Sequence, residues 1–154
     1  MTEQGIERHE PFWKAGYAAV TIAGVVLVAA AVRWTQRDVR AAQQILAGLA
    51  AGRPSVSQAI RWEHLRTLDA DIGSAYAGLP NDHERQAYQQ SFVAKFAEGF
   101  RQAGGYVKAF RGWRVQSRNA EQVVVAADYP LRGKTLLLSL SASGRRQLEG
   151  LQWQ

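Results

Sequence analysis

One uncharged stretch constrains this chain more than any other feature of its sequence. Residues 15–32 read AGYAAVTIAGVVLVAAAV, contain no charged side chain and lie between Lys14 and Arg33. A helix of this length extends about 27 Å, close to the roughly 30 Å hydrocarbon thickness of a bilayer. The stretch therefore predicts a transmembrane helix over residues 15–34, preceded by an N-terminal tail at residues 1–14.

Aromatic residues at both ends agree with a helix that crosses the bilayer. Trp13 and Trp34 would lie about 31 Å apart along a helix, and indole rings favour the membrane interfaces. A buried helix of a globular domain usually keeps a polar stripe, whereas this stretch offers little beside Thr21. The bilayer is thus the first partner that we expect.

A cleaved secretion signal is the alternative interpretation of the same residues. Ala29 and Ala31 have the small-residue spacing of a cleavage site, which would leave Val32 as the first residue. Three glutamates among the first ten residues argue against a signal, because signal peptides usually begin with basic residues. We expect a retained signal-anchor, with the cleaved signal as the alternative.

Two arguments about the side of the membrane disagree. Arg8 and Lys14 precede the stretch and four arginines at positions 33–53 follow it, so the positive-inside rule places the following domain in the cytoplasm. A short tail before an anchor is, however, most often the cytoplasmic part. We therefore expect the domain on the extracytoplasmic, periplasmic side, with the cytoplasmic orientation as the alternative. The lack of cysteine fits either compartment.

Small residues recur along one side of the predicted membrane helix. Ala15, Ala19 and Ala23 are spaced by four residues, and Gly16 and Gly24 lie beside them. Small side chains allow two membrane helices to approach closely. We therefore expect this side to pack against another membrane protein subunit.

Helical spacing of apolar residues continues after the membrane stretch. A stripe over residues 36–50 ends at a Gly-Arg-Pro sequence, which predicts a juxtamembrane helix and linker at residues 35–54. A second helix is predicted over residues 55–79. Ser55 and Gln58 have the spacing of a capping box there, and apolar residues then recur every three or four positions.

The third predicted helix has the clearest end signals. Asn81 and Glu84 form an N-terminal capping pair, and a Gly-Gly pair ends the pattern. Aromatic residues repeat at every fourth position along its inner face, namely Tyr88, Phe92, Phe96 and Phe100. Such a ladder is typical of core packing, and the alternative is one wall of a ligand pocket.

After Gly105 the apolar period changes from 3.6 residues to 2, which predicts strands. Four alternating segments follow, at residues 112–118, 123–129, 135–142 and 147–154. Their short connections imply an antiparallel meander. The sequence thus predicts an α+β domain over residues 55–154, with about three helices packed on a four-stranded antiparallel β-meander.

A helical layer with an aromatic inner face, followed by a meander that ends in LEGLQW, resembles the cystatin-like/NTF2-like superfamily. The resemblance covers residues 55–154 and implies an α+β fold with helices against one face of a sheet. Membrane-anchored members of that fold include accessory and assembly subunits of bacterial secretion systems. The resemblance therefore also implies a role of that kind.

Sequence motifs for catalysis and for metal or cofactor binding are lacking. The chain has no cysteine, and His9, His64 and His83 do not have the spacing of a metal site. No nucleophile-elbow motif and no phosphate-binding glycine motif occurs. We expect no enzyme activity, no cofactor and no metal.

The C-terminal third carries the positive charge of the chain. Residues 101–154 contain nine Lys/Arg and three Asp/Glu. The residues that we expect to form a partner-binding basic surface are Arg111, Arg114, Arg118, Arg132, Lys134, Arg145 and Arg146. An acidic protein face or anionic lipid fits this surface, whereas specific nucleic acid does not, because Trp113 lies on the apolar strand face. Charge reversal at Arg114 and Arg118 is expected to leave the fold intact and to weaken assembly.

Two functional expectations follow. The first is a non-enzymatic, single-pass membrane protein that serves as an accessory or assembly subunit of a membrane complex. The second is an extracytoplasmic domain of the NTF2-like kind that binds a small ligand, either anchored or released from a cleaved signal. The second expectation predicts a cavity of roughly a few hundred cubic ångströms between the aromatic helix face and the sheet.

Overall fold

The computed structural model describes residues 13–67 and 70–154, with the side chains of 13–27 and 29 left out. The chain divides into two compact units. The second unit, Thr35–Gln154, contains the sheet and the helices that follow α1.

The first helix, α1, spans Trp13–Ala50. Its C-terminal part confirms the helix predicted over residues 36–50. There Ala42, Ile45 and Leu49 are buried in the core of the second unit.

The transmembrane helix predicted at residues 15–34 lies largely outside the described side chains. The same holds for the predicted packing residues Ala15, Gly16, Ala19, Ala23 and Gly24. In the described part of the chain, no helix combines the length and the apolarity that a membrane crossing needs.

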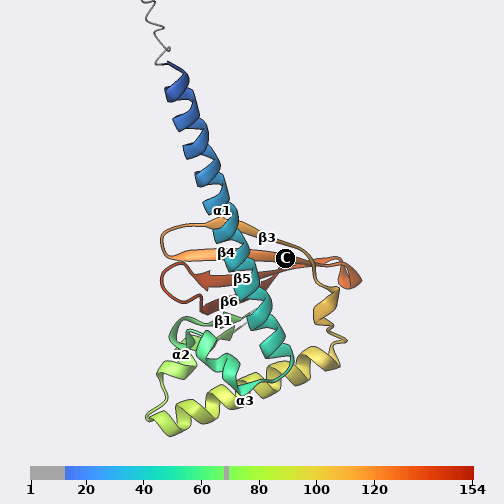
Figure 1. Cartoon of the computed structure of the whole chain (residues 1–154). Coiled ribbons are helices and arrows are strands. Elements are labelled where there is room, and N and C mark those ends of the chain that lie inside the picture. Colours follow the sequence, from blue (N-terminus) through green and yellow to red (C-terminus); the bar gives the residue numbers. More distant parts are fainter. Residues whose placement is uncertain (1–12, 68–69) are drawn as a thin grey trace, which may run out of the picture. The chain divides into compact units, whose positions relative to one another are not determined.

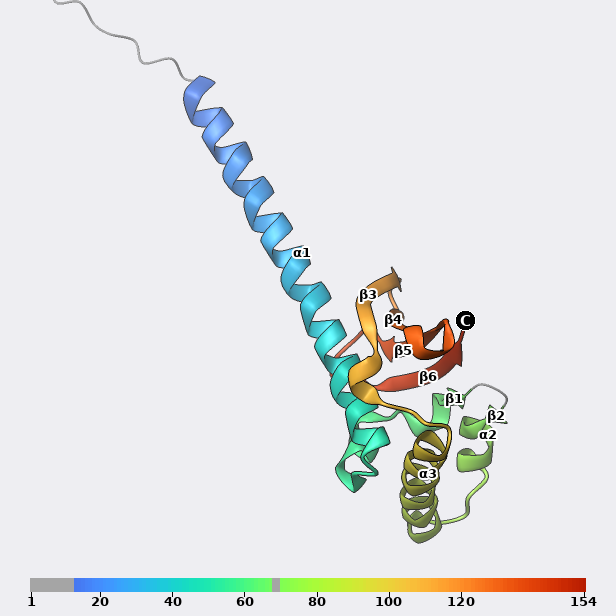
Figure 2. The same cartoon turned by 90° about the vertical axis from the view of Figure 1, so that its right-hand side faces the viewer.

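In the described residues the sheet contains six strands, in the order β2-β1-β6-β5-β4-β3 (Figures 1 and 2). The four long strands are β3 (Arg111–Arg118), β4 (Gln122–Tyr129), β5 (Lys134–Ser141) and β6 (Leu148–Trp153). They form the predicted antiparallel meander, which confirms the α+β class. The expected total of four strands is wrong, because β1 (Arg66–Thr67) pairs in parallel with β6 and β2 (Ala70–Asp71) pairs with β1.

The single helix predicted over residues 55–79 is also wrong. Besides β1 and β2, the segment contains the 3-10 turns η1 (Pro54–Ala59) and η2 (Trp62–His64) and the short helix α2 (Ile72–Ala77). The Arg61 N–H donates to the Leu148 carbonyl at 2.9 Å, and Ile60 forms a parallel bridge with Leu148. Pairing with β6 holds this segment extended and outweighs its helical spacing.

Helix α3 (Asp82–Gln102) confirms the third predicted helix. The side-chain Oδ1 of Asn81 accepts a hydrogen bond from the Glu84 N–H at 2.9 Å, and the side-chain Nδ2 of Asn81 donates to the Glu84 carboxylate at 3.2 Å. At the other end, the Gly105 N–H donates to a carbonyl of the last turn at 2.7 Å, and Gly104 has a φ of 70°. Glycine adopts this left-handed conformation without steric strain, so the helix ends here.

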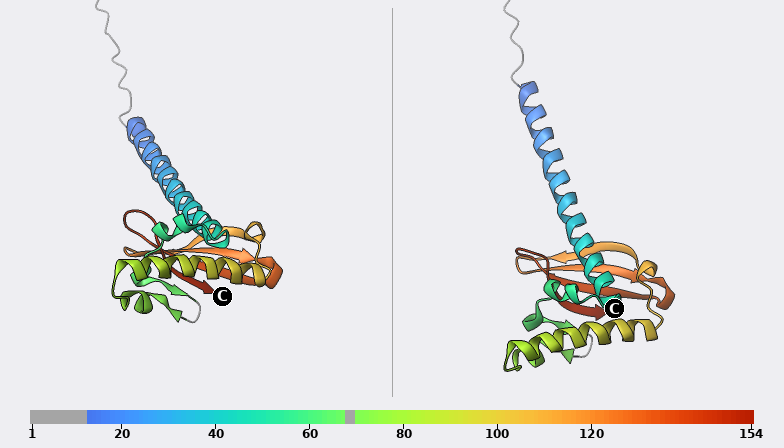
Figure 3. Two further views of the ribbon diagram at one scale, coloured as in Figure 1. Left: turned by 90° about the horizontal axis from the view of Figure 1, so that it is seen from below. Right: turned by 60° about the horizontal axis from the view of Figure 1, so that its bottom comes forward.

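One face of the sheet carries the core. Alternate residues of β4 and β5 point to this face and are buried, namely Val123, Val125, Ala127, Leu136, Leu138 and Leu140. The C-terminal part of α1 and the aromatic face of α3 belong to the same core, and Figure 3 shows α3 lying along the sheet. The turns η3 (Val107–Ala109) and η4 (Pro130–Arg132) follow α3 and β4 in the chain, respectively.

Candidate functional site

A cavity of about 320 Å³ lies between the C-terminal half of α3 and the core face of the sheet. Residues of α1, α3, η4, β4, β5 and β6 line it. Its larger apolar and aromatic lining residues are Leu46, Phe96, Phe100, Tyr129, Leu136, Leu151 and Trp153. Concave sites of this size and composition are typical of small-molecule pockets.

The aromatic ladder of α3 has two parts with different surroundings. Phe96 and Phe100 line the cavity, and their rings are stacked with centroids 6.2 Å apart. Phe92 and Tyr88 instead pack edge-on against the buried Trp62, with centroid distances of 5.4 and 6.5 Å. Of the four predicted wall residues, the structure therefore places two in the cavity and two in an aromatic core cluster.

The opposite wall consists of sheet residues that sequence reasoning did not assign to a pocket. Tyr129 ends β4 and Trp153 ends β6, and their ring centroids are 6.1 Å apart. Both rings contact the buried Phe110, at 4.7 and 6.1 Å between centroids. The alternation of Leu151 and Trp153 with polar residues indicates the core face, but it does not show that this face borders open space.

Hydrogen bonds connect sheet-side residues of the cavity with the segment at the end of α3. The Tyr129 hydroxyl donates to the Gly104 carbonyl and accepts from the Tyr106 N–H, each at 3.2 Å. The Arg132 guanidinium donates to the Ala103 carbonyl at the end of α3. A cation at a helix C-terminus is favourable because it opposes the helix dipole. These bonds link the end of α3 and the residues that follow it to β4 and η4.

Three exposed basic side chains lie at the edge of the cavity, and we call them its basic rim. Lys95 on α3, Arg132 in η4 and Lys134 at the start of β5 all line the cavity, and all three are exposed. The apolar lining residues Leu46 and Leu136 are buried. None of the described residues that line the cavity is acidic. The site can therefore accept an apolar group inside and a negative charge at its edge.

Gly99 leaves part of the cavity open. It lies on α3 among the lining residues, and a Cβ atom placed on it would meet no atom within 4 Å. Glycine inside a helix costs about 0.5–1 kcal/mol of stability relative to alanine. Gly99 is exposed and adds no side chain to the cavity wall, at the expense of helix stability.

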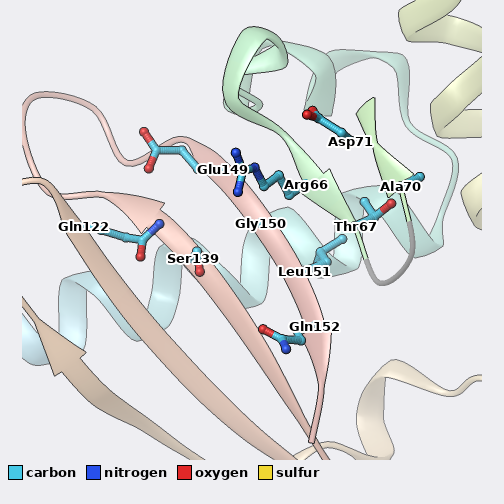
Figure 4. Close-up of a pocket in the computed structure, with 10 residues that line it drawn as sticks. All are labelled: Arg66, Thr67, Ala70, Asp71, Gln122, Ser139, Glu149, Gly150, Leu151 and Gln152. Atoms are coloured by element: carbon cyan, nitrogen blue, oxygen red, sulfur yellow. The ribbon is translucent and has the colours of Figure 1, made fainter. Parts of the chain in front are cut away.

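A larger polar cleft of about 570 Å³ lies between the β1–β2 hairpin and strands β4 to β6 (Figure 4). Its two carboxylates already have partners. Asp71 accepts from the Ser74 N–H at 3.1 Å and from the Ser74 hydroxyl at 2.8 Å, and Glu149 pairs with Arg61 at 2.9 Å. The bonds from Ser74 hold the pKa of Asp71 below its usual range. These groups thus serve the local structure, and the mostly polar lining does not suit an apolar ligand.

Two residues of the predicted basic surface take part in a buried ion cluster. The Arg146 Nε donates to Asp38 at 2.6 Å, and Arg118 donates to the other carboxylate oxygen of Asp38. Asp38 and Arg146 are buried, so Arg146 is not a surface residue, contrary to the sequence expectation. Charge reversal at Arg118 would place a second carboxylate beside Asp38, so the geometry favours a loss of stability over the intact fold that the sequence predicts.

The other predicted surface residues are exposed. Arg114 pairs with Asp128 at 2.8 Å, and this bond is the main reason that the pKa of Asp128 lies below its usual range. Arg111 donates to two nearby backbone carbonyls. Arg145 lies in the β5–β6 connection. The basic surface is therefore smaller than the sequence predicts. Its last two predicted members, Arg132 and Lys134, belong to the rim of the cavity.

No group of three or more His, Cys, Asp or Glu side chains in the described residues is placed to hold a metal ion. No protein-family model, no curated protein and no solved structure matches the chain. The candidate site accordingly rests on the geometry of the cavity.

Proposed function

We propose that this chain is a membrane-anchored domain that binds a small, largely apolar molecule between α3 and the sheet. The observation that carries the proposal is the cavity of about 320 Å³ lined by Phe96, Phe100, Tyr129 and Trp153. Small-molecule sites are commonly concave, about 300–1,000 Å³ in volume and lined by apolar and aromatic side chains with few polar groups. Binding, without catalysis, is the proposed activity.

Open space beside aromatic rings supports a ligand rather than ordinary core packing. Protein interiors are packed about as densely as organic crystals and contain few voids larger than a water molecule. The N-terminal rings of α3 follow this rule against Trp62, whereas Phe96 and Phe100 border the cavity. The cavity is partly open to solvent, so an apolar ligand would remove these rings from water, which is favourable in proportion to the apolar area buried.

Membrane attachment is the second part of the proposal. Its support is the uncharged sequence at 15–32 with Trp13 and Trp34 at its ends, which is long enough for a membrane helix. We propose that this segment is retained as an anchor and that the domain faces the periplasmic side.

Photoaffinity labelling tests binding at this site. The full chain is placed in lipid nanodiscs and irradiated with tetradecanol that carries a diazirine near the end of its alkyl chain. Labelled positions are then mapped by peptide mass spectrometry. We expect the labels to concentrate on the C-terminal half of α3 and around Trp153, because these segments form the two walls of the cavity.

Substitutions at Gly99 provide a matched pair for this experiment. Gly99→Leu fills the open space and is expected to abolish labelling of the cavity walls. Gly99→Ala adds one methyl group, so labelling should persist while the unfolding free energy rises by about 0.5–1 kcal/mol. Undiminished wall labelling in Gly99→Leu, or labels without enrichment at the walls, would contradict the proposed binding.

A second candidate function is that of an accessory or assembly subunit of a membrane complex, such as a secretion system. It is favoured by the exposed Arg111 and Arg114 on β3, the strand at the sheet edge. Two register shifts interrupt the β3–β4 pairing, and such irregularities discourage the addition of a partner strand. The arginine side chains would therefore make the contact with an acidic partner.

Co-purification in mild detergent distinguishes this second candidate. Arg111→Glu with Arg114→Glu is expected to lose the partner proteins, while Arg53→Glu at another exposed arginine should keep them. Identical sets of co-purified proteins in the double variant and the wild type would exclude docking through β3.

A further inference from the structure

We infer that the ligand of this cavity is a single-chain fatty acid whose alkyl chain enters the apolar interior and whose carboxylate lies at the basic rim. The inference rests on the proposed ligand-binding function and adds the chemical class of the ligand. Its basis is the combination of an apolar lining with three basic side chains at one cavity.

Lys95 and Lys134 supply positive charge at the cavity. Neither lysine takes part in a salt bridge within the described part of the chain. The acidic residues nearest to them in sequence have other partners. Glu98 accepts a hydrogen bond within α3 at 3.0 Å, and Asp128 pairs with Arg114 at 2.8 Å. The rim therefore attracts an anion from outside the chain.

The positions of the charges suit an amphiphile rather than a small buried anion. Because Lys95 and Lys134 are exposed, a carboxylate beside them stays partly hydrated and avoids the high cost of burying a charge. The alkyl chain meanwhile leaves water for a wall of phenylalanine, leucine and tryptophan side chains, which is favourable in proportion to the apolar area buried.

The volume of the cavity suits a ligand with one alkyl chain. Its volume of about 320 Å³ lies at the lower end of the range for small-molecule sites, about 300–1,000 Å³. A volume at this end of the range favours a single alkyl chain over the two chains of a phospholipid.

A carboxylate head group fits the rim better than a phosphate. Helix N-termini favour phosphate groups, whereas a helix C-terminus carries partial negative charge and disfavours a doubly charged phosphate more than a singly charged carboxylate. Here the Arg132 guanidinium is bound to the Ala103 carbonyl, and the helix end at the cavity is the C-terminus of α3. The free cations are the two lysine ammonium groups, which bind as point charges.

A matched pair of probes tests the head group. Diazirine-bearing tetradecanoate and tetradecanol are compared at pH 8 on the full chain in nanodiscs of zwitterionic phosphatidylcholine. The measured quantity is the probe concentration that gives half-maximal labelling of the cavity walls. We expect tetradecanoate to label at a concentration on the order of tenfold lower than tetradecanol, as two partly exposed ion pairs would provide.

Variants that remove the lysine charges show whether the rim causes the difference in labelling between the two probes. Lys95→Gln with Lys134→Gln should remove the preference for the acid, so that tetradecanoate and tetradecanol label the cavity walls at similar concentrations. Lys108→Gln with Arg145→Gln removes the same charge from exposed positions outside the cavity lining and should keep the preference. Thermal melting of each variant confirms that it is folded.

The outcomes separate this inference from the proposed function. Equal wall labelling by acid and alcohol, or an acid preference that survives in Lys95→Gln with Lys134→Gln, would overturn the fatty-acid inference and leave apolar binding in place. Competition by unlabelled tetradecyl phosphate at lower concentration than tetradecanoate would overturn the carboxylate assignment. Absence of wall labelling by both probes would overturn the inference and the proposed function together.

Discussion

At the scale of single residues, the charge inside the domain is concentrated around Asp38. Its carboxylate is fully buried and accepts hydrogen bonds from Arg118 and Arg146. The Arg146 guanidinium also donates to the Ser141 carbonyl at 3.3 Å. An intact buried ion pair adds little net stability, but removing one partner leaves the other charge uncompensated in the interior.

Asp38→Ala is expected to lower the unfolding free energy by about 3–5 kcal/mol, because Arg146 would keep its buried charge without a counter-ion. Urea denaturation of the full chain in mild detergent measures the change. Glu121→Ala, at an exposed carboxylate, is the control and should change stability by less than about 0.5 kcal/mol. Similar values for both variants would show that the buried cluster does not depend on Asp38.

Two carboxyl groups with lowered pKa values make the unfolding free energy depend on pH. Hydrogen bonds from Ser74 lower the pKa of Asp71, and bonds from Arg114 and then Thr135 lower the pKa of Asp128. A carboxyl group with a lowered pKa in the folded state stabilises that state above the unfolded-state pKa, and the contribution disappears as the pH falls through the folded-state pKa.

We therefore expect the unfolding free energy to decrease below about pH 4. In Asp128→Asn the decrease should be smaller, because one of the two contributing carboxyl groups is missing. Urea titrations between about pH 7 and pH 3 measure the effect. An identical pH dependence in the wild type and in Asp128→Asn would show that this carboxylate does not contribute.

At the scale of elements, helix α3 was predictable because its signals are local. The capping pair of Asn81 and Glu84 and the glycine pair after Gln102 act within one turn of the helix. Residues 55–79 also have helical spacing, yet their structure depends on pairing with β6, which lies far away in the sequence. Spacing alone does not show such a distant partner, so the prediction of one helix was wrong.

The two halves of α3 are expected to differ in their contribution to stability. Phe92→Ala removes a ring that packs edge-on against Trp62 at 5.4 Å, and its cost should approach the about 3–5 kcal/mol of a buried phenylalanine. Phe96→Ala should cost less, because part of its ring borders open space.

Chemical denaturation compares the two variants, and labelling of the cavity walls should weaken only in Phe96→Ala. A larger loss of stability for Phe96→Ala than for Phe92→Ala would mean that the cavity region is packed as tightly as the aromatic core cluster.

At the scale of the whole molecule, the uncharged sequence at 15–32 predicts how the chain fractionates. We expect the full chain to remain with the membrane after alkaline carbonate extraction and to be released by detergent. Val25→Arg places a charge near the centre of the stretch, where insertion becomes less favourable by about 2.5–3.5 kcal/mol, so more of this variant should be extracted.

Intact mass of the same material decides between anchor and cleaved signal. An unprocessed chain in the membrane fraction supports the anchor, and Val25→Ala serves as the control that keeps the stretch apolar. A chain that begins at Val32 and appears in the carbonate extract would instead identify residues 1–31 as a cleaved signal, and the proposed membrane attachment would be withdrawn.

Features that arise from neighbouring residues could be predicted from the amino-acid sequence. The sequence predicted α3 from its capping residues, the four-stranded meander from alternating side chains, and the apolar side of each of these elements. Contacts between groups that are distant in the sequence depend on the folded chain. The tertiary structure added β1 to the edge of β6, paired Asp38 with two arginines, and left Phe96 and Phe100 beside a cavity while Phe92 packs on Trp62. The physical reason is that periodicity records which face of an element is apolar, whereas the space between two apolar faces depends on how all their side chains fit together.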